Sequence, residues 1–473
     1  MRGKLSFGGL FIVEIKIFVT LTDKYSNYNQ DMKRFFSIIA LLTLTANLLC
    51  GQEYDSPEYI SLGREKARTK VVPYPTAEEA QALGAGMVAS KFVRPVKEWT
   101  RTEEADAVVF TSKYVIPFVW LSRMAILYVD EASGAYEVII NGQKVGYSAN
   151  AFAPAEFNVT KASKEDLNTI SIRVLKDHPS RKLECFNDKT DVHIGEVFVM
   201  SQPMIRVREV LHNTRVDMKS EWANVDLGIV VKTESLNPKK ARIHYELVAP
   251  DTTVVTYGHR DITIGMRGED TIKFAAQIPY ALTWCAEMPV RYRLNIRTQV
   301  EGRNVEYQSH MIGFRTVESD KEGNFYINGI QTELFYRDFD PLTVTDKDII
   351  AARVLKYNAL RFKMGAVPQN VYRMCDSLGM YVIAQVPINS SKSGLSRQVG
   401  GNPSNDPRWK NAYLDRVETS YRTTRGHASV IGYIMAEESS NGINLYESYL
   451  HLKKWEAKRP VVYIDAAGEW NSD

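Results

Sequence analysis

Cysteine is scarce in this chain of 473 residues, which has only four. They stand at Cys50, Cys185, Cys285 and Cys375, and their spacing matches neither a zinc motif nor a dense disulfide framework. We therefore expect no metal cluster. A bond between Cys185 and Cys285 in an oxidising compartment and buried free thiols both stay open as interpretations.

Charge of one sign is also lacking. The 59 basic and 56 acidic residues nearly balance, and no block of Lys or Arg stands out. Binding to nucleic acid or to an anionic membrane surface favours such a block. We expect neither partner.

Long apolar runs are missing except near the start of the chain. Lys33 and Arg34 precede an apolar run over residues 35–49, and small residues follow it. This layout is typical of a secretory signal peptide over residues 32–52, and its apolar core is short for a membrane span. We expect export to the periplasm or the extracellular space, with no membrane span in the mature chain.

Two alternatives at this end stay open. Residues 1–31 fit an upstream extension from a misjudged start codon, or an N-terminal anchor over residues 10–21 that Glu14 and Lys16 interrupt. Cys50 precedes Gly51 after the apolar run and is a candidate for lipid attachment, although Leu49 is a poor neighbour for that reaction. Plain export is our preferred interpretation.

Short β-type segments with turns between them fill residues 94–202, after a lead-in over residues 53–93. "AYEVII" and "KVGYS" flank Asn141-Gly142, a strong signal for a two-residue hairpin turn. Several strands at this spacing predict a β-sandwich. Residues 203–317 continue with alternating strands such as "ARIHYELV", as an immunoglobulin-like β-sandwich needs.

The pattern changes within residues 318–473, where strands and helices alternate. "ALRFK", "MYVIAQVP", "SVIGYIMAEE" and "PVVYID" are separated by helical segments, which predicts parallel strands with right-handed crossovers. We expect about five strands, where an eight-stranded barrel needs roughly three more. An open half-barrel leaves two unpaired strand edges.

Several segments, taken in order, resemble glycoside hydrolase family 2, the family of β-galactosidases, β-glucuronidases and β-mannosidases. They are "AYEVIINGQKVGY", "APAEFNVT", "NTISIRVL", "LTWCAEMPVRYRL", "IGFRTVE", "FYINGIQ", "NALRFKMGAVPQNVYRMCDSLGMYVIAQ" and "HASVIGYIMAEESSNG". The resemblance runs from about Arg94 to the C-terminus. It implies a multidomain β and α/β protein, with a jelly-roll-like sandwich of sugar-binding type, an immunoglobulin-like sandwich and a (β/α)8 TIM barrel truncated after about five strands.

The resemblance also implies a catalytic residue. The family's fourth barrel strand ends in an asparagine–glutamate pair, whose glutamate is the general acid/base, and Glu438 falls on that glutamate. A retaining glycosidase needs a second carboxyl group about 5 Å away. The family's nucleophile is a glutamate on the seventh strand, which this chain does not reach. The plainer interpretation of Glu438 is a solvated carboxylate at a strand end.

Glu437 takes the place of the family's asparagine. Successive strand residues point to opposite faces, so Glu437 is poorly placed to be the second carboxyl group at one bond. Its charge would raise the pKa of one member of the pair, and the loss of the asparagine amide removes a contact to the sugar.

Other substrate-contact positions follow from the same resemblance. Arg361 matches the family's arginine, Met364 stands where many members have a histidine, and Asp338 lies at the end of the first barrel strand. Asn389 replaces the magnesium-binding glutamate of the β-galactosidases. Since hard cations prefer charged oxygen ligands, we expect no magnesium site and no other cofactor.

Two functions remain in competition. The first is an exported, retaining β-glycosidase that acts on β-linked glycans or oligosaccharides; self-association is common in the family. The second is a carbohydrate-binding pseudoenzyme or an inactive gene fragment, because several sugar-contacting positions differ and the nucleophile strand is missing. The sequence does not name the sugar.

Overall fold

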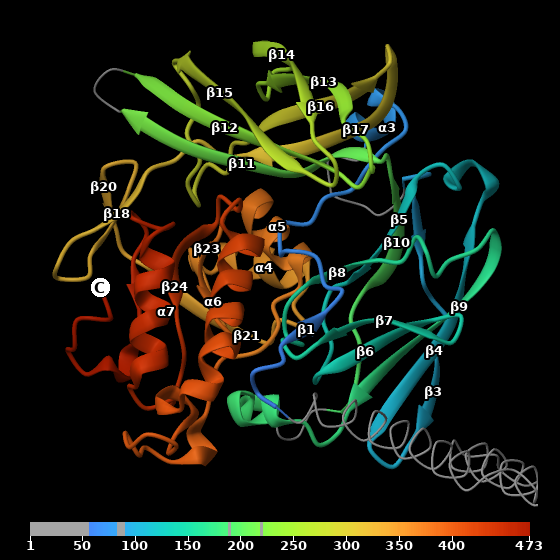
Figure 1. Ribbon diagram of the computed structural model, residues 1–473. Helices are drawn as coiled ribbons and strands as arrows, with labels where there is room; N and C mark the ends of the chain where they lie inside the picture. Colours follow the sequence, from blue (N-terminus) through green and yellow to red (C-terminus); the bar gives the residue numbers. More distant parts are fainter. Residues whose placement is uncertain (1–55, 83–89, 188–190, 218–220) are drawn as a thin grey trace, which may run out of the picture. The chain divides into compact units, whose positions relative to one another are not determined.

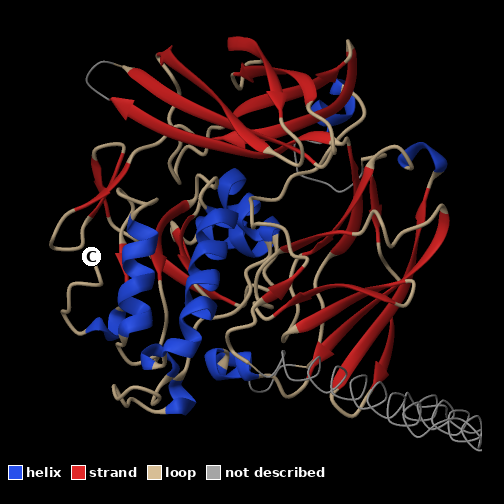
Figure 2. Cartoon of the chain, in the orientation of Figure 1, coloured by secondary structure: helices blue, strands red, loops and turns tan. Residues whose placement is uncertain are grey.

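The computed structural model describes residues 56–82, 90–187, 191–217 and 221–473. The extension over residues 1–31, the signal peptide over residues 32–52 and Cys50 lie outside these residues. The chain divides after Tyr59, and every element below belongs to Ile60–Asp473. Strands dominate the first two thirds of this unit, and most helices lie in the last third (Figure 2). Within the described ranges, no helix is long and apolar enough to cross a membrane.

The first domain is a β-sandwich of a six-stranded sheet, in the order β1-β7-β6-β9-β4-β3, and a four-stranded sheet, in the order β2-β10-β5-β8. Asn141 and Gly142 both have positive φ at the β6–β7 turn, as predicted for this hairpin. The lead-in segment also contributes, because Ser61 of β1 pairs with Ser148 of β7. The elements are β1 (Ser61–Leu62), α3 (Ala77–Ala82), β2 (Val93–Pro95), β3 (Thr100–Glu103), β4 (Ala107–Ile116), η2 (Phe118–Trp120), β5 (Met124–Val129), β6 (Tyr136–Ile140), β7 (Gln143–Ser148), β8 (Ala155–Asn158), β9 (Asp166–Leu175), η3 (Pro179–Leu183), η4 (Cys185–Asn187) and β10 (Val197–Gln202).

The second domain is an immunoglobulin-like sandwich of sheets β11-β12-β15 and β14-β13-β16-β17. Its strands alternate buried and wet residues, as β13 does with Ile243 buried and Arg242 exposed, and the buried faces form one core. The strands are β11 (Ile205–Asp217), β12 (Trp222–Thr233), β13 (Lys239–Val248), β14 (Val254–Ile264), β15 (Glu269–Pro279), β16 (Tyr292–Val300) and β17 (Arg303–Ile312).

The third domain opens with a small antiparallel sheet and continues as five parallel strands in the order β21-β22-β23-β24-β25 (Figure 1). The expected strand–helix alternation and fold class are therefore confirmed. The elements are β18 (Val317–Ser319), β19 (Phe325–Ile327), β20 (Ile330–Thr332), β21 (Tyr336–Phe339), α4 (Asp346–Val354), β22 (Ala359–Phe362), α5 (Gln369–Leu378), β23 (Tyr381–Gln385), η5 (Ser391–Ser393), η6 (Pro403–Asn405), η7 (Pro407–Trp409), α6 (Lys410–Thr424), β24 (Val430–Ile434), α7 (Ile443–Lys453), β25 (Val461–Val462) and η8 (Ile464–Ala466).

Local chemistry sets the ends of the first two helices of this domain. Thr345 and Asp348 form a capping box at the start of α4, where each side chain bonds the other residue's backbone N–H. Gly379 ends α5 in the left-handed region, with φ +78°. The capping box fixes where α4 begins after β21, and Gly379 fixes where the chain turns from α5 into β23.

Residues of the second domain pack against the starts of strands β22, β23 and β24 and so join the second domain to the third. Trp284, fully buried, donates from Nε1 to the carbonyl oxygen of Asp376 at 2.9 Å and packs edge-on against Tyr381 of β23. Ala359 and Ile431 belong to the same apolar cluster. The amino-terminal half of the sheet is thus covered, and its carboxyl ends are left for the candidate site.

Candidate active site

The fourth parallel strand leads directly into the two adjacent acids. After β24, the Glu437 backbone N–H donates to the carbonyl oxygen of Ile388 at 2.9 Å, and Glu437 forms a parallel bridge with Asn389. The segment that follows β23 therefore lies beside the one that follows β24. Both segments stand at the carboxyl edge of the sheet, where barrel enzymes place their active sites.

Glu437 is half-buried at this edge. The amide Nε2 of Gln385, the last residue of β23, donates to Glu437 Oε1 at 3.4 Å. Burial raises the pKa of Glu437, the negative charges of Glu438 and Asp465 raise it further, and the positive charge of Arg361 lowers it. Glu437 thus retains a proton to a higher pH than an isolated glutamate.

Glu438 leaves the strand geometry altogether. Its φ is +44°, which is uncommon for a residue with a side chain, and it lies beyond the end of β24 at Ile434. The side chain is exposed, and its Oε2 accepts a hydrogen bond from Asn389 Nδ2 at 3.2 Å. Neighbours in sequence, the two carboxylates therefore have different partners: Gln385 for Glu437 and Asn389 for Glu438.

Asn389 is buried, and both its amide oxygen and its amide nitrogen form hydrogen bonds. Its Oδ1 accepts from the backbone N–H of Ser391 at 3.1 Å and from that residue's hydroxyl at 2.8 Å, while its amide holds Glu438. An uncharged oxygen that already accepts two hydrogen bonds is a poor ligand for Mg²⁺, so this position does not fit the ion. Across the described ranges, no group of three or more His, Cys, Asp or Glu side chains is arranged to hold a metal.

Asp338 and Arg361 meet at the ends of the first two strands. They are register partners between β21 and β22, and both carboxylate oxygens of Asp338 accept from the guanidinium, at 2.6 and 2.8 Å. Both side chains are exposed, and Arg361 lowers the pKa of Asp338. Met364 is half-buried in the following loop. The structure thus pairs two of the predicted substrate contacts with each other rather than with a glutamate.

A loop of the first domain completes the edge. Glu184 bridges Asn389 from the side opposite Glu437, and the Cys185 backbone N–H donates to the Asn389 carbonyl oxygen at 3.0 Å. Glu184 also forms a buried ion pair with Arg416 of α6, whose Nε donates to the Pro387 carbonyl oxygen at 3.2 Å. Cys185, Cys285 and Cys375 are free thiols. The sandwich therefore supports the segment that positions Glu438.

Sequence reasoning missed three residues that shape this edge: Asp465, Glu184 and Arg416. Asp465 follows β25 and its charge acts on Glu437, so a search for acids after every predicted strand would have found it. Glu184 and Arg416 are separated by 232 positions and share no local signal. Only the folded chain brings them together.

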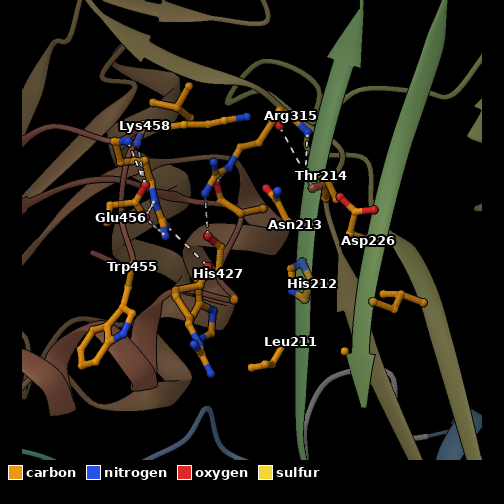
Figure 3. A pocket seen from close by; sticks show the side chains of 18 of the residues that line it. Leu211, His212, Asn213, Thr214, Asp226, Arg315, His427, Trp455, Glu456 and Lys458 are labelled. Carbon is orange, nitrogen blue, oxygen red and sulfur yellow. Dashed lines mark hydrogen bonds and ion pairs between the residues drawn. The ribbon is translucent and has the colours of Figure 1, made fainter. Parts of the chain in front are cut away.

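A cleft of about 750 Å³ lies at the opposite, amino-terminal ends of β24 and β25, facing β11, β12 and β15 (Figure 3). The Arg315 guanidinium donates there to the carbonyl oxygens of His427 (2.9 Å), Val430 (2.7 Å) and Ala428. His427 Nδ1 lies 2.7 Å from Asp376 Oδ2. The Arg315 hydrogen bonds join the second domain to the start of the fourth strand, and His427 is held by Asp376.

Three family descriptions match successive parts of the chain. "Glycosyl hydrolases family 2, sugar binding domain" covers residues 53–202, "Glycosyl hydrolases family 2" covers residues 205–315 and "Glycosyl hydrolases family 2, TIM barrel domain" covers residues 325–472. Together they span all three domains.

Curated relatives agree with these matches. A β-galactosidase of Priestia megaterium is 26% identical over 433 residues, which are 87% of this chain and 39% of that protein. A β-galactosidase of Psychromonas ingrahamii is 24% identical, over 75% of this chain and 35% of that protein. The chain therefore spans somewhat more than a third of the length of these relatives.

Solved structures share the fold at low sequence identity. β-Glucuronidase 2 of Bacteroides uniformis superposes with a TM-score of 0.63 at 17% identity, covering 76% of this chain and 46% of that one. The β-D-mannosidase of Dictyoglomus thermophilum gives 0.60 at 17% identity, covering 76% and 50%. At these identities the likeness establishes the architecture alone.

Proposed function

Because the chain belongs to glycoside hydrolase family 2, we propose that it serves in a glycosidase that hydrolyses O-glycosidic bonds of β-linked sugars, in the β-galactosidase manner. The observation behind this proposal is the placement of Glu437 and Glu438 after the fourth parallel strand, at the carboxyl edge of the sheet.

Glu438 is the proposed general acid/base. It is solvent-accessible, and Asn389 orients one of its oxygens at 3.2 Å. Burial and the charge of the neighbouring Glu438 raise the pKa of Glu437, which would contact the substrate. The substrate side of the edge would be lined by Asp338, Arg361 and Met364.

We propose a retaining reaction. Such a reaction needs a nucleophilic carboxylate about 5 Å from the acid/base. Glu437 and Glu438 are bound by different partners, so the pair does not supply both roles at one bond. A carboxylate from outside β21–β25 would act as the nucleophile.

Hydrolysis of nitrophenyl β-galactoside, β-glucuronide and β-mannoside tests the proposal. Glu438→Gln should lower kcat by a factor of about 10²–10⁴, because it replaces the general acid/base with an amide of similar size that cannot transfer the proton. Glu165→Gln, an exposed glutamate of the first domain, is the control and should leave the rate unchanged. Measurable hydrolysis by the unmodified chain that Glu438→Gln leaves unchanged would remove the assignment.

The second candidate function is carbohydrate binding without turnover. Two observations favour it. Asp338 and Arg361 form an ion pair with each other rather than with a ligand, and the amide oxygen of Asn389 already accepts two hydrogen bonds from Ser391. Sugar affinity without hydrolysis, equal in the unmodified chain and in Glu438→Gln, would support this function over the first.

We also propose that the protein acts outside the cytoplasm, in the periplasm or the extracellular space. The support is the signal-peptide pattern over residues 32–52. Fractionation of cells that express the chain, with a version lacking residues 1–52 as the control, would locate it. Retention of both versions in the cytoplasm would contradict export.

A further inference from the structure

The outer face of the second domain contains a cleft far from the two acids. It measures about 530 Å³ and lies over sheet β14-β13-β16-β17 beside α3. Small-molecule sites are typically about 300–1,000 Å³, so its size fits a ligand of one or a few rings. Glu437, Glu438 and their partners do not line it.

The strand register places polar side chains in two rows across this cleft. Directly opposed positions on neighbouring strands bring their side chains within about 5 Å on one face of a sheet. The first row is Tyr307, Arg297, His244 and His259, and the second is Ser309, Asn295, Glu246 and Tyr257. His244 and His259 face each other with ring centroids 5.3 Å apart.

Several of these polar groups have no partner within the part of the chain that the structure describes. Among the described residues, the buried Nε of Arg297 and the buried Nε2 of His244 have no hydrogen-bond partner, although the His244 side chain also interacts with Gln299. Buried donors and acceptors without partners are costly, so they are normally satisfied by water or by a ligand. Glu246 adds an acceptor, whose hydrogen bond within the described ranges comes from the Asn295 amide at 3.4 Å.

An aromatic ring stands at the rim of the same cleft. Tyr257 is 78% exposed, although it lies in the middle of β14 rather than at a loop tip. Tyrosine combines a flat apolar face with a polar tip, which suits a ligand that is apolar on one face and hydroxylated at its edges. The C–H face and the hydroxyl groups of a pyranose have this character.

The balance of charge and of hydrogen-bonding groups in the cleft limits the chemical class of ligand that fits it. One guanidinium stands against one carboxylate, so the cleft has no strong net charge. Burial and the charge of Arg297 lower the pKa of His244, which keeps its imidazole neutral near pH 7. A wall of mixed donors and acceptors matches hydroxyl groups, which both donate and accept.

We infer that this cleft is a second, non-catalytic binding site for a neutral saccharide unit, with Tyr257 as the stacking surface and Arg297, Glu246 and Asn295 as the hydroxyl-binding groups. The inference goes beyond the proposed glycosidase, because binding here needs no contribution from Glu438. A site on the second domain would hold a glycan chain while another of its units is at the sheet edge.

Affinity electrophoresis of the full chain tests the inference. The gels contain soluble β-galactan or β-mannan, with polygalacturonate as the acidic comparison. We expect retardation by a neutral glycan, and a loss of affinity of about tenfold in Tyr257→Ala and in Arg297→Ala, about the factor that one well-made contact provides. Tyr280→Ala is the matched control, because Tyr280 is also 78% exposed and lies outside the cleft. Circular dichroism spectra of all variants establish that they fold.

The outcomes separate this site from the sheet edge. Retardation that survives Glu438→Gln and is lost in Tyr257→Ala supports the cleft, whether or not the chain hydrolyses any glycoside. The inference is overturned if neutral glycans do not retard the unmodified chain or if only polygalacturonate does. Equal retardation of Tyr257→Ala and Tyr280→Ala also overturns it.

Discussion

Glu437 and Glu438 show how strongly two adjacent glutamates can differ in environment. Glu437 is half-buried at the end of the sheet, with Gln385 as its hydrogen-bond donor, whereas Glu438 is exposed and accepts from Asn389. Like charges in contact and burial both disfavour the ionised form of a carboxyl group, and Glu437 experiences both. The ionised form of Glu437 is therefore disfavoured in the folded chain.

Glu437→Gln tests this difference through the free energy of unfolding. The pKa of Glu437 is raised in the folded state, so the folded chain binds its proton more tightly than the unfolded chain does. The resulting stability is present at low pH and is lost as the pH rises through the folded-state pKa. At pH 7 the neutral glutamine should therefore stabilise the chain, by at most about 1 kcal/mol because water screens a half-exposed group.

Urea unfolding at about pH 7 and about pH 4 measures the effect, since a glutamate in an unfolded chain titrates near the lower value. The advantage of Glu437→Gln should disappear at the lower pH. A variant that is less stable than the unmodified chain at pH 7 would show that ionised Glu437 is stabilised by its surroundings, contrary to our interpretation.

At the scale of single elements, Gly379 determines where helix α5 ends. Gly379 has φ +78°, and a Cβ on it would lie 2.1 Å from the carbonyl oxygen of Ala286 in the second domain. The glycine thus ends the helix and also lets the second domain approach β23. Both demands exclude any larger residue.

Gly379→Ala should therefore destabilise the chain by more than the about 1–2 kcal/mol that a left-handed alanine alone costs. Gly323→Ala is the control, because Gly323 has a similar φ of +83° and a Cβ added there would meet no atom within 4 Å. Urea midpoints of the two variants separate backbone strain from the collision. Equal losses would show that the contact with Ala286 relaxes without cost.

Periodicity and turn residues predicted the alternation of strands and helices in residues 318–473 and the hairpin at Asn141. The directions of the two acids were beyond the same reasoning. Alternation of faces holds only within a strand, and β24 ends at Ile434, before either acid. The partner of Glu438 lies 49 positions away, so no local pattern could have identified it.

At the scale of the whole molecule, one buried ion pair links the first domain to the parallel sheet. Glu184 is 2% exposed and Arg416 is 2% exposed, and the arginine also reaches backbone carbonyl oxygens of both domains, at Ala149 and Pro387. Burial raises the pKa of Glu184, while Arg416 counteracts this shift. A charge left alone at this depth would be expensive.

Arg416→Met should lower the free energy of unfolding by about 3–5 kcal/mol, because it leaves Glu184 buried without its partner. Arg242→Met, which breaks the exposed pair with Asp261, is the control and should leave the free energy of unfolding almost unchanged, because water screens the pair. Urea unfolding of Arg416→Met, Glu184→Gln and the double variant measures the coupling. Additive losses would show that the two residues act independently.

The backbone bridges on either side of Asn389 make the carboxyl edge of the sheet depend on more than one domain. One bridge comes from the first domain at Glu184 and the other from the segment after the fourth strand at Glu437. Three backbone segments from separate parts of the chain therefore lie side by side here. A change of the first-domain loop that shifts Glu184 would therefore also shift Asn389, and with it the amide that holds Glu438. The first domain thus takes part in placing a side chain that belongs to the third.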